Sequence, residues 1–258
     1  MKKQLITRLC ACLVVALCGM PLMAQGIVVY QKDGTKVKYP YELIDSIVTY
    51  NVGEDVEDEP VTPPATGATA VDLGLSVKWA SCNVGATSPE EYGGYYAWGE
   101  TEEKTSYSWS TYKWCNGSYD TQTKYCTSSS YGTVDNKTTL DPEDDVAHAK
   151  WGGGWRMPTK SEQDELRNSC TWSWTTVNGV NGYRVTGPNG NSIFLPAAGY
   201  RSRSGGDVYD SGSYGGYWSA TLDEDDSDLA YYLYFLDGDC GWDSSDRYNG
   251  ISVRPVTE

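Results

Sequence analysis

Apolar and polar residues alternate over short stretches of this chain, in the two-residue period of β-strands. Leu229–Leu236 (LAYYLYFL) predicts a strand, while Leu75–Ala80 and Ile251–Val256 predict the first and last strands of a domain. Tyr183–Thr186 and Ser192–Leu195 flank a Pro-Asn-Gly turn, which is typical of a β-hairpin. The C-terminal part of the chain is therefore expected to consist mainly of short strands and loops.

Helical periodicity is expected in two places. Thr159 precedes Glu162 by three residues, and this capping box predicts a helix that begins after Thr159 and runs to about Cys170. Residues 141–150 predict another short helix, because Pro142 suits the first turn and the acids beside it suit the positive end of the helix dipole. Two helices with many short strands indicate an α+β domain.

Residues 1–24 have the pattern of a signal peptide. Basic residues precede an apolar run that is too short to span a bilayer, and the small residue Ala24 suits the cleavage point. A lipoprotein signal anchored at Cys18 is the alternative. No later run approaches the roughly 20 apolar residues of a membrane helix. We therefore expect export to the cell surface, the periplasm or the medium, without membrane insertion.

Three further segments follow the signal peptide. Residues 25–50 read as a small β-element, with strands IVVYQ and TKVKY around a Lys-Asp-Gly turn and a third strand near residues 44–50. Residues 51–69 are acidic and rich in Pro and Thr, which is typical of an extended linker. Residues 70–258 are long enough for one domain with its own core.

Charge and cysteine content narrow the classes of function. Loss of residues 1–24 leaves 17 basic against 35 acidic residues, a net charge of −18, which disfavours binding to nucleic acid. The lone histidine, His148, and the absence of paired cysteines argue against structural zinc. Cys115 and Cys126 bracket a polar loop and are the first candidates for a disulfide. Five cysteines follow the signal peptide: Cys82, Cys115, Cys126, Cys170 and Cys240.

Six motifs occur in an order that resembles a known family. They are DLGLSVKWASCNVG, YYAWGE, GGGWRMPTKSEQDEL, FLPAAGYR, GGYWSAT and ISVRPV. Together they resemble the Fibrobacter succinogenes major paralogous domain, a family of exported bacterial proteins, over essentially all of residues 70–258. That family is similar in fold to C-type lectins and to the formylglycine-generating, sulfatase-modifying proteins. The resemblance implies a C-type-lectin-like domain whose first and last strands pair, with Val77 and Trp79 beside Val253 and Pro255.

The residues do not favour an enzyme. The formylglycine-generating oxidases use a copper-binding cysteine pair, whereas Cys240 stands alone and one thiol cannot supply a two-thiolate site. His148 lies in a predicted helix near acids of the same turns, so a helix-face residue is favoured over a general base. Arg156 and Arg254 are expected to be structural, each paired with a buried acid or carbonyl.

The expected binding region lies between Asp207 and Asp246, which contains eleven acids and no Lys or Arg. Tyrosine and tryptophan in the same stretch offer contact area at low entropic cost. The aromatic residues from Tyr231 to Phe235, together with Trp218, are expected to pack in the core instead. The candidate ligand-binding residues are Tyr209, Asp210, Trp242, Asp243, Asp246 and Tyr248.

Two versions of this binding function stay open. Asp237 and Asp239, or the acids of residues 223–228, could coordinate calcium, although the Glu-Pro-Asn and Gln-Pro-Asp signatures of sugar-binding lectins are missing. Otherwise two expected loops, DVYDSGSYGG (residues 207–216) and GDCGWDSSDRYNG (residues 238–250), contact an extracellular glycan or protein directly, with no cofactor. The alternative to a binding module is a structural surface or fimbria-associated subunit that docks through a strand edge in residues 27–50.

Overall fold

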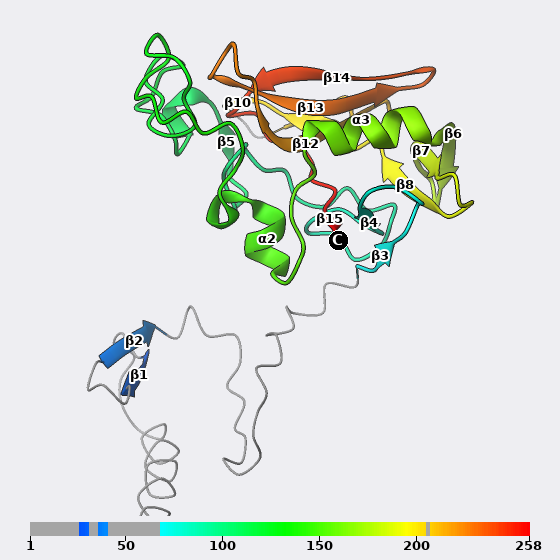
Figure 1. Ribbon diagram of the computed structural model, residues 1–258, viewed down its shortest axis with the longest axis horizontal. Helices are drawn as coiled ribbons and strands as arrows, with labels where there is room; N and C mark the ends of the chain where they lie inside the picture. Colours follow the sequence, from blue (N-terminus) through cyan, green and yellow to red (C-terminus); the bar gives the residue numbers. More distant parts are fainter. Residues whose placement is uncertain (1–25, 31–35, 41–67, 205–206) are drawn as a thin grey trace, which may run out of the picture. The chain divides into compact units, whose positions relative to one another are not determined.

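The computed structural model describes residues 26–30, 36–40, 68–204 and 207–258 of the chain, which divides into two units at residues 1–57 and 58–258. In the first unit, β1 (Gly26–Tyr30) and β2 (Lys36–Pro40) form a two-stranded antiparallel sheet (Figure 1), as predicted. The signal peptide with Cys18, the third strand near residues 44–50 and almost all of the linker lie outside the described residues.

The second unit combines a few short helices with several small antiparallel sheets, which confirms an α+β class (Figure 1). Its helices are η2 (Trp109–Thr111), η3 (Pro142–Asp144), α2 (Val146–Trp151) and α3 (Lys160–Ser169). Its strands are β3 (Ala70–Val71), β4 (Lys78–Ala80), β5 (Ser106–Tyr107), β6 (Thr171–Val177), β7 (Val180–Thr186), β8 (Ser192–Pro196), β9 (Tyr200–Arg201), β10 (Arg203–Ser204), β11 (Val208–Tyr209), β12 (Tyr214–Leu222), β13 (Leu229–Leu236), β14 (Asp239–Asp246) and β15 (Val256–Thr257). No helix in the described ranges has the length and apolarity needed to cross a bilayer.

Helix α3 begins at the predicted capping box. The Glu162 carboxylate accepts the backbone N–H of Thr159 at 2.8 Å, and the Thr159 hydroxyl accepts the backbone N–H of Glu162 at 3.3 Å. The helix ends at Ser169, one residue before the predicted Cys170. Leu166 is fully buried in a cluster with Leu233 and other core residues of β12 and β13, so α3 covers one face of that sheet (Figure 1).

The helix predicted over residues 141–150 is divided in two. The backbone is extended at Asp145, between η3 and α2. The Asp145 carboxylate accepts the backbone N–H groups of Ala147, His148 and Met157 at 2.9, 3.1 and 2.7 Å. The Asp145 side chain therefore caps the N-terminus of α2 and links this helix to the backbone at Met157.

The sheet β12-β13-β14 carries the features that matter most for function. β13 has the predicted bounds, and the predicted hairpin corresponds to β7 and β8 in a second sheet, β6-β7-β8. β14 corrects the expectation that residues 239–246 form a loop, because it pairs with β13 along its whole length. The two strands are joined at Asp237-Gly238, where Gly238 has a φ of +86°. An Asp-Gly pair between two strands of alternating apolar and polar residues is typical of a hairpin turn, but the acidic composition suggested a loop instead.

The strands predicted as first and last, which correspond to β4 and β15, pair as expected but in another register, and β3 precedes β4 in the chain. Val256 lies opposite Trp79, and Thr257 lies opposite Lys78, in the sheet β15-β4-β3. The expected neighbours Val253 and Pro255 instead accept the backbone N–H groups of residues 84 and 80. The predicted strand 251–256 is interrupted: within it only Val256 belongs to β15, and the Arg254 side chain is buried in the core.

Two buried arginines satisfy their guanidinium groups with oxygens of neutral groups. Arg254 donates to the Asn83 side chain at 2.8 Å and to the carbonyls of Ala80 and Phe194 at 2.9 Å each. Arg247 donates to three carbonyls and the Tyr112 hydroxyl, and the prediction had not singled it out. The structural roles expected for Arg254 and for Arg156, which pairs with Glu162, are confirmed.

The predicted disulfide between Cys115 and Cys126 is wrong, because the five cysteines of the described residues are free. Cys126 is buried, and its thiol donates to the Ser128 carbonyl at 3.1 Å. Cys115 packs against a cluster around Tyr95, and its thiol donates to the Trp109 carbonyl at 3.2 Å. Each thiol therefore has a carbonyl partner of its own, and the two are not bonded to each other.

Candidate functional site

Three of the six candidate residues line one cavity of about 440 Å³. Asp210, Asp246 and Tyr248 belong to this set. We call the cavity the tyrosine pocket, after the residue type that dominates its lining. The full lining is Tyr200, Ser202, Asp210, Tyr214, Tyr232, Ser245, Asp246, Tyr248, Asn249 and Ile251.

The tyrosine pocket is assembled from segments that are far apart in sequence. β9 and β11 pair so that Tyr200 lies opposite Tyr209. The turn after β11 places Asp210 in a left-handed conformation with a φ of +57°, and its carbonyl accepts the backbone N–H of Tyr214 at 3.0 Å. β13 contributes Tyr232, and the end of β14 with the loop that follows completes the lining.

The tyrosine rings form a continuous row. Tyr200 packs edge-on against Tyr214 at 6.0 Å and lies against Tyr209 at 5.6 Å with the two rings tilted by 30°. Tyr214 stacks parallel to Tyr234 at 6.5 Å, and all three distances are between ring centroids. A Cβ atom at Gly241 would lie 2.9 Å from the Tyr234 ring. Glycine at this position therefore lets the Tyr234 ring lie directly on the backbone of the neighbouring strand.

Two tyrosine hydroxyls of the pocket, those of Tyr214 and Tyr232, stay protonated at neutral pH. Burial raises the pKa of both Tyr214 and Tyr232, and the Tyr214 hydroxyl donates to the Tyr232 oxygen at 3.0 Å. Burial also raises the pKa of the Asp246 carboxyl, against a hydrogen bond from Tyr248. The lining thus offers neutral hydroxyls as donors and acceptors, together with a half-buried carboxylate.

Asn249 leaves a hydrogen-bonding group of the lining without a partner. The residue is 8% exposed, and its amide nitrogen donates to the Ser245 hydroxyl at 2.9 Å. Its amide oxygen Oδ1 is buried and has no hydrogen-bond partner in the structure. A buried acceptor without a donor is destabilising. A ligand that donates a hydrogen bond to it would remove that cost.

The other three candidate residues lie outside the pocket lining. Tyr209 is 41% exposed and stacks on Tyr200 at the pocket rim, and Asp243 is exposed on β14 opposite Tyr232. Trp242 is adjacent to Asp243 and lies opposite Leu233, so its side chain is on the face of the sheet opposite to that of Asp243 and Tyr232. There it packs edge-on against Tyr231 at 5.5 Å, with the Lys160 ammonium 3.4 Å from its ring centroid.

The two weak calcium candidates lie at the tip of the β13–β14 hairpin. Asp237 and Asp239 are exposed and flank Gly238. The Asp239 carboxylate accepts the Tyr234 hydroxyl at 3.5 Å. Among the described residues, neither belongs to a group of three side chains that could ligate a metal together. In the loop at residues 223–228, the Asp223 carboxylate accepts the backbone N–H of Asp225 at 3.1 Å, a hydrogen bond within the loop itself.

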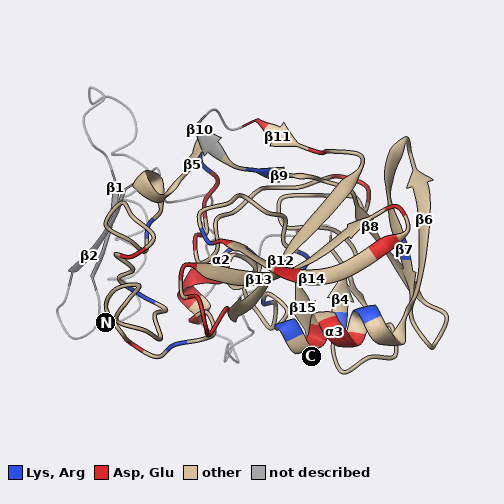
Figure 2. Cartoon of the chain, turned by 90° about the horizontal axis from the view of Figure 1, so that it is seen from above, with Lys and Arg blue, Asp and Glu red and all other residues tan. Residues whose placement is uncertain are grey.

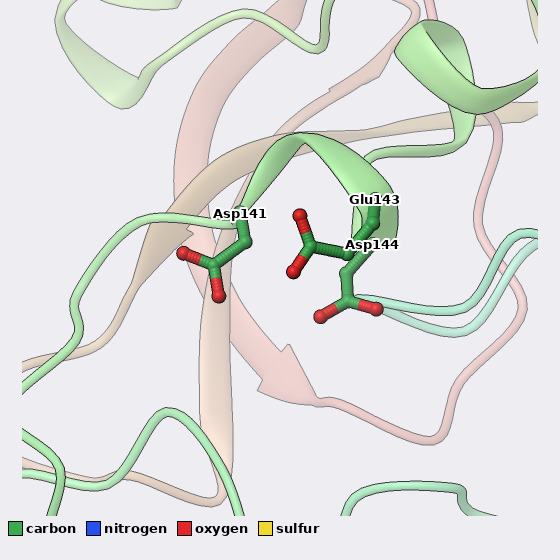
Figure 3. A group of neighbouring side chains, drawn as sticks. All are labelled: Asp141, Glu143 and Asp144. Atoms are coloured by element: carbon green, nitrogen blue, oxygen red, sulfur yellow. The ribbon is translucent and has the colours of Figure 1, made fainter. Parts of the chain in front are cut away.

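One group of three carboxylates does converge, at Asp141, Glu143 and Asp144 (Figure 3). The Lys124 ammonium already lies among them, 2.7 Å from Asp141 and 2.6 Å from Asp144. Its ammonium is also 4.9 Å from the Trp114 ring centroid and 4.8 Å from that of Tyr125. A lysine of the chain itself therefore takes the position that a metal cation would need, and the cluster is an ion-pair network.

A second cavity, of about 340 Å³, contains the only histidine. It is lined by Asp145, His148, Trp155 and Met157, among others. The Asp145 carboxylate is engaged by three backbone N–H groups and caps α2, so it is not free to orient the imidazole. Asp145 therefore does not supply this cavity with the orienting carboxylate that a histidine needs in a hydrolytic relay.

Several residues of the tyrosine pocket were not predicted from the sequence: Tyr200, Ser202, Tyr214, Tyr232, Ser245, Asn249 and Ile251. Tyr200 is the second-last residue of the FLPAAGYR motif, residues 194–201, and this motif was the one sequence signal for that segment. β14 itself contains Asp239, Asp243 and Asp246, and acidic residues are coloured red on this strand in Figure 2. Neither a family model, nor a curated protein, nor a solved structure matches this chain.

Proposed function

We propose that this chain is an exported, non-catalytic binding module that recognises an extracellular glycan in the tyrosine pocket. The observation that carries the proposal is the pocket itself, where tyrosine rings, two carboxylates and an unpartnered amide oxygen converge. Ligand sites are concave, lined by aromatic side chains, and fixed in orientation by a few polar groups. The tyrosine pocket has this composition.

A sugar suits these groups for two reasons. The apolar face of a pyranose ring packs against aromatic rings, and its hydroxyl groups donate to carboxylate and amide oxygens. Asp210, Asp246 and the Asn249 oxygen supply such acceptors. Tyr209 extends the aromatic surface beyond the pocket, so a ligand longer than one sugar unit has a second ring to stack on.

A C-type-lectin-like fold and export belong to the same proposal. The pairing of β4 with β15 and the small number of helices support the fold. The basic and apolar pattern of residues 1–24 supports export. The Asp145 carboxylate is engaged by three backbone N–H groups and does not orient His148, which supports a binding role without catalysis. The acidic composition supports a partner other than nucleic acid.

The test compares two exposed aromatic residues. Binding of the full chain to a glycan panel is measured by titration calorimetry, with product analysis for hydrolysis. Tyr209→Ala, at the rim, is expected to weaken glycan binding about tenfold. Trp242→Ala is the matched control, because Trp242 is 40% exposed but lies on the opposite face of the sheet, and it should leave the affinity unchanged.

Several outcomes would contradict the proposal. Hydrolysis of a bound glycan would make the chain an enzyme. Equal losses in both variants would place binding outside the pocket. Capture of proteins or ordered polymers with no glycan binding would favour a structural surface or fimbria-associated subunit.

Calcium is not required by this proposal. Asp237 and Asp239 do not line the tyrosine pocket. Glycan affinity is therefore expected to be the same in calcium and in excess chelator, and unchanged in the double variant Asp237→Asn, Asp239→Asn. Loss of binding in chelator would restore the calcium-dependent version.

A further inference from the structure

We infer that the tyrosine pocket selects glycans that carry free, protonated amino groups, such as 2-amino-2-deoxy sugars, over neutral and anionic glycans. This inference rests on the proposed function and names the ligand class of the same site. It depends on four features of the lining: the sign of its charges, its surroundings, its aromatic rings and its unpartnered acceptor.

The charged residues of the lining are all acidic. Asp210 and Asp246 contribute carboxylates, and no Lys or Arg is among the lining residues. Within the described part of the chain, neither carboxylate takes part in an ion pair. The pocket therefore has negative charge without a described counterion, which favours cationic ligands and repels anionic ones.

Two further acids lie outside the lining but interact with lining residues. Asp243 lies opposite Tyr232 on the neighbouring strand. Burial raises the pKa of the Asp228 carboxyl and the negative charge of Asp246 acts in the same direction, while the buried Arg247 guanidinium acts against both. Half-buried carboxylates that destabilise one another are both stabilised by one cation placed between or beside them.

The tyrosine rings favour a cation for an independent reason. The face of an aromatic ring carries partial negative charge, and several rings around one ammonium group form a recognised binding arrangement. Tyr200, Tyr214, Tyr232 and Tyr248 line the pocket. The hydroxyl group of Tyr232 already accepts a hydrogen bond from Tyr214, so these hydroxyls are held in a fixed network.

The unpartnered acceptor fits an ammonium group better than a hydroxyl. An ammonium has three donors and no acceptor, whereas a hydroxyl has one donor and two acceptor positions. The Asp246 carboxylate accepts only, so an ammonium can donate to it without leaving an acceptor of its own unpaired. The buried Asn249 oxygen, which has no donor, adds to the negative potential of the lining. A carboxylate ligand would meet these acceptors and would have only the tyrosine and serine hydroxyls as donors.

Elsewhere in the same molecule, carboxylates and aromatic rings already surround an ammonium group, that of Lys124. The Lys124 ammonium is held by the carboxylates of Asp141 and Asp144 and lies near the rings of Trp114 and Tyr125. The tyrosine pocket has the corresponding groups, carboxylates and aromatic rings, but its lining includes no lysine. A ligand amine would take the position that Lys124 takes in the internal cluster.

The experiment uses four oligosaccharides of equal length with the full chain: a glucosamine oligomer, its N-acetylated form, a cello-oligosaccharide and an oligogalacturonate. Titration at about pH 6, above the ordinary carboxyl pKa, keeps the amine protonated. The glucosamine oligomer is expected to bind about tenfold more tightly than the acetylated form. The oligogalacturonate is expected to bind least.

Two matched variants separate the pocket from the general negative charge of the protein. Asp246→Asn should lower the affinity for the glucosamine oligomer to that for its N-acetylated form, so that the preference for the amine is lost. Asp239→Asn makes the same change on the same strand, outside the pocket, and should keep the preference. If Asp246→Asn fails to fold, Asp210→Asn replaces it, since asparagine tolerates the positive φ of that turn.

Failure of this inference is distinguishable from failure of the proposed function. Equal affinity for the amine and the acetylated form, or equal loss of preference in Asp239→Asn and Asp246→Asn, would overturn the amine selectivity while glycan binding stands. No binding of any of the four oligosaccharides or of the wider panel would overturn both. Capture of lysine-rich peptides in place of amino sugars would also overturn the inference.

Discussion

Glu162 is the residue whose local role follows most directly from the sequence. Its carboxylate caps α3 and also accepts two hydrogen bonds from the Arg156 guanidinium, at 2.6 and 2.8 Å. Burial acts to raise the pKa of Glu162, but the hydrogen bonds from Arg156 and Thr159 outweigh burial and lower it. The Thr-x-x-Glu spacing predicted the cap. The pairing with Arg156 adds a second contact from the segment before the helix.

The lowered pKa of Glu162 makes part of the stability depend on pH. A carboxyl whose pKa is lower in the folded state stabilises the protein above its unfolded pKa of about 4.3, and this stabilisation is lost as the pH falls through the folded value. Glu162→Gln is expected to cost about 1 kcal/mol at pH 7, since glutamine keeps the cap but loses the charge. Thermal unfolding from pH 7 to pH 2 should show the two curves converging in acid. A difference that persists undiminished at pH 2 would contradict this account.

Other residues of the site could not be predicted at this scale. Asn249 has no local signal, because its unpartnered oxygen is defined by the strands and loops that surround it. Asp210 and Asp246 were predicted from composition, yet composition also pointed to Trp242. Strand alternation sends Trp242 to the opposite face, and this depends on a strand that the sequence analysis took for a loop.

At the scale of elements, strands and helices with a strong local pattern were predicted well. β13 and the β7–β8 hairpin have clear alternation, and α3 has its capping box. β14 was missed because its acids and glycine resemble a loop, and only pairing with β13 makes it a strand. The break at Asp145 was missed because a tertiary contact with Met157 stabilises it.

The β13–β14 hairpin should depend on the conformation of Gly238. A Cβ atom there would meet no other atom within 4 Å, so the effect of Gly238→Ala comes from the φ of +86° alone. We expect a loss of about 1 kcal/mol in the free energy of unfolding by denaturant. Gly238→Asn, which tolerates this conformation better, should recover part of the loss. Equal stability of Gly238→Ala and the parent protein would show that the hairpin turn is not as described.

The pairing of β4 and β15 should be sensitive to the side chain at Val256. Val256 is fully buried between the sheets, whereas its neighbour Thr257 is half-buried. Val256→Ala is expected to lower the free energy of unfolding by about 2 kcal/mol, and Thr257→Ala by about 0.5 kcal/mol or less. Chemical denaturation of the two variants measures the difference. Similar losses in both would argue against the observed register.

At the scale of the whole molecule, the five thiols of the described domain contribute no covalent cross-link. Stability must then come from packing of the aromatic core and from hydrogen bonds such as those of Arg247 and Arg254. The α+β class followed from the pattern of short strands. The register between β4 and β15 could not be predicted, because it depends on long-range backbone hydrogen bonds such as the one from Ala80 to Pro255.

Reduction should therefore leave the domain unchanged. The midpoint of thermal unfolding is expected to be the same with and without dithiothreitol. Alkylation of the denatured, unreduced protein should modify all five cysteines that follow residue 24. A lower midpoint after reduction, or fewer than five modified thiols, would show a disulfide and restore the bridge expected from the sequence.

The arrangement of β3, β4 and β15 has a consequence for engineering. β3 and β15 flank the same strand, so the first and last strands of the domain lie about two inter-strand spacings apart, roughly 10 Å. A short peptide could join them, and the chain could be opened at the exposed tip of a hairpin instead. The domain is thus suited to circular permutation, or to insertion as a cassette into a surface loop of a carrier protein.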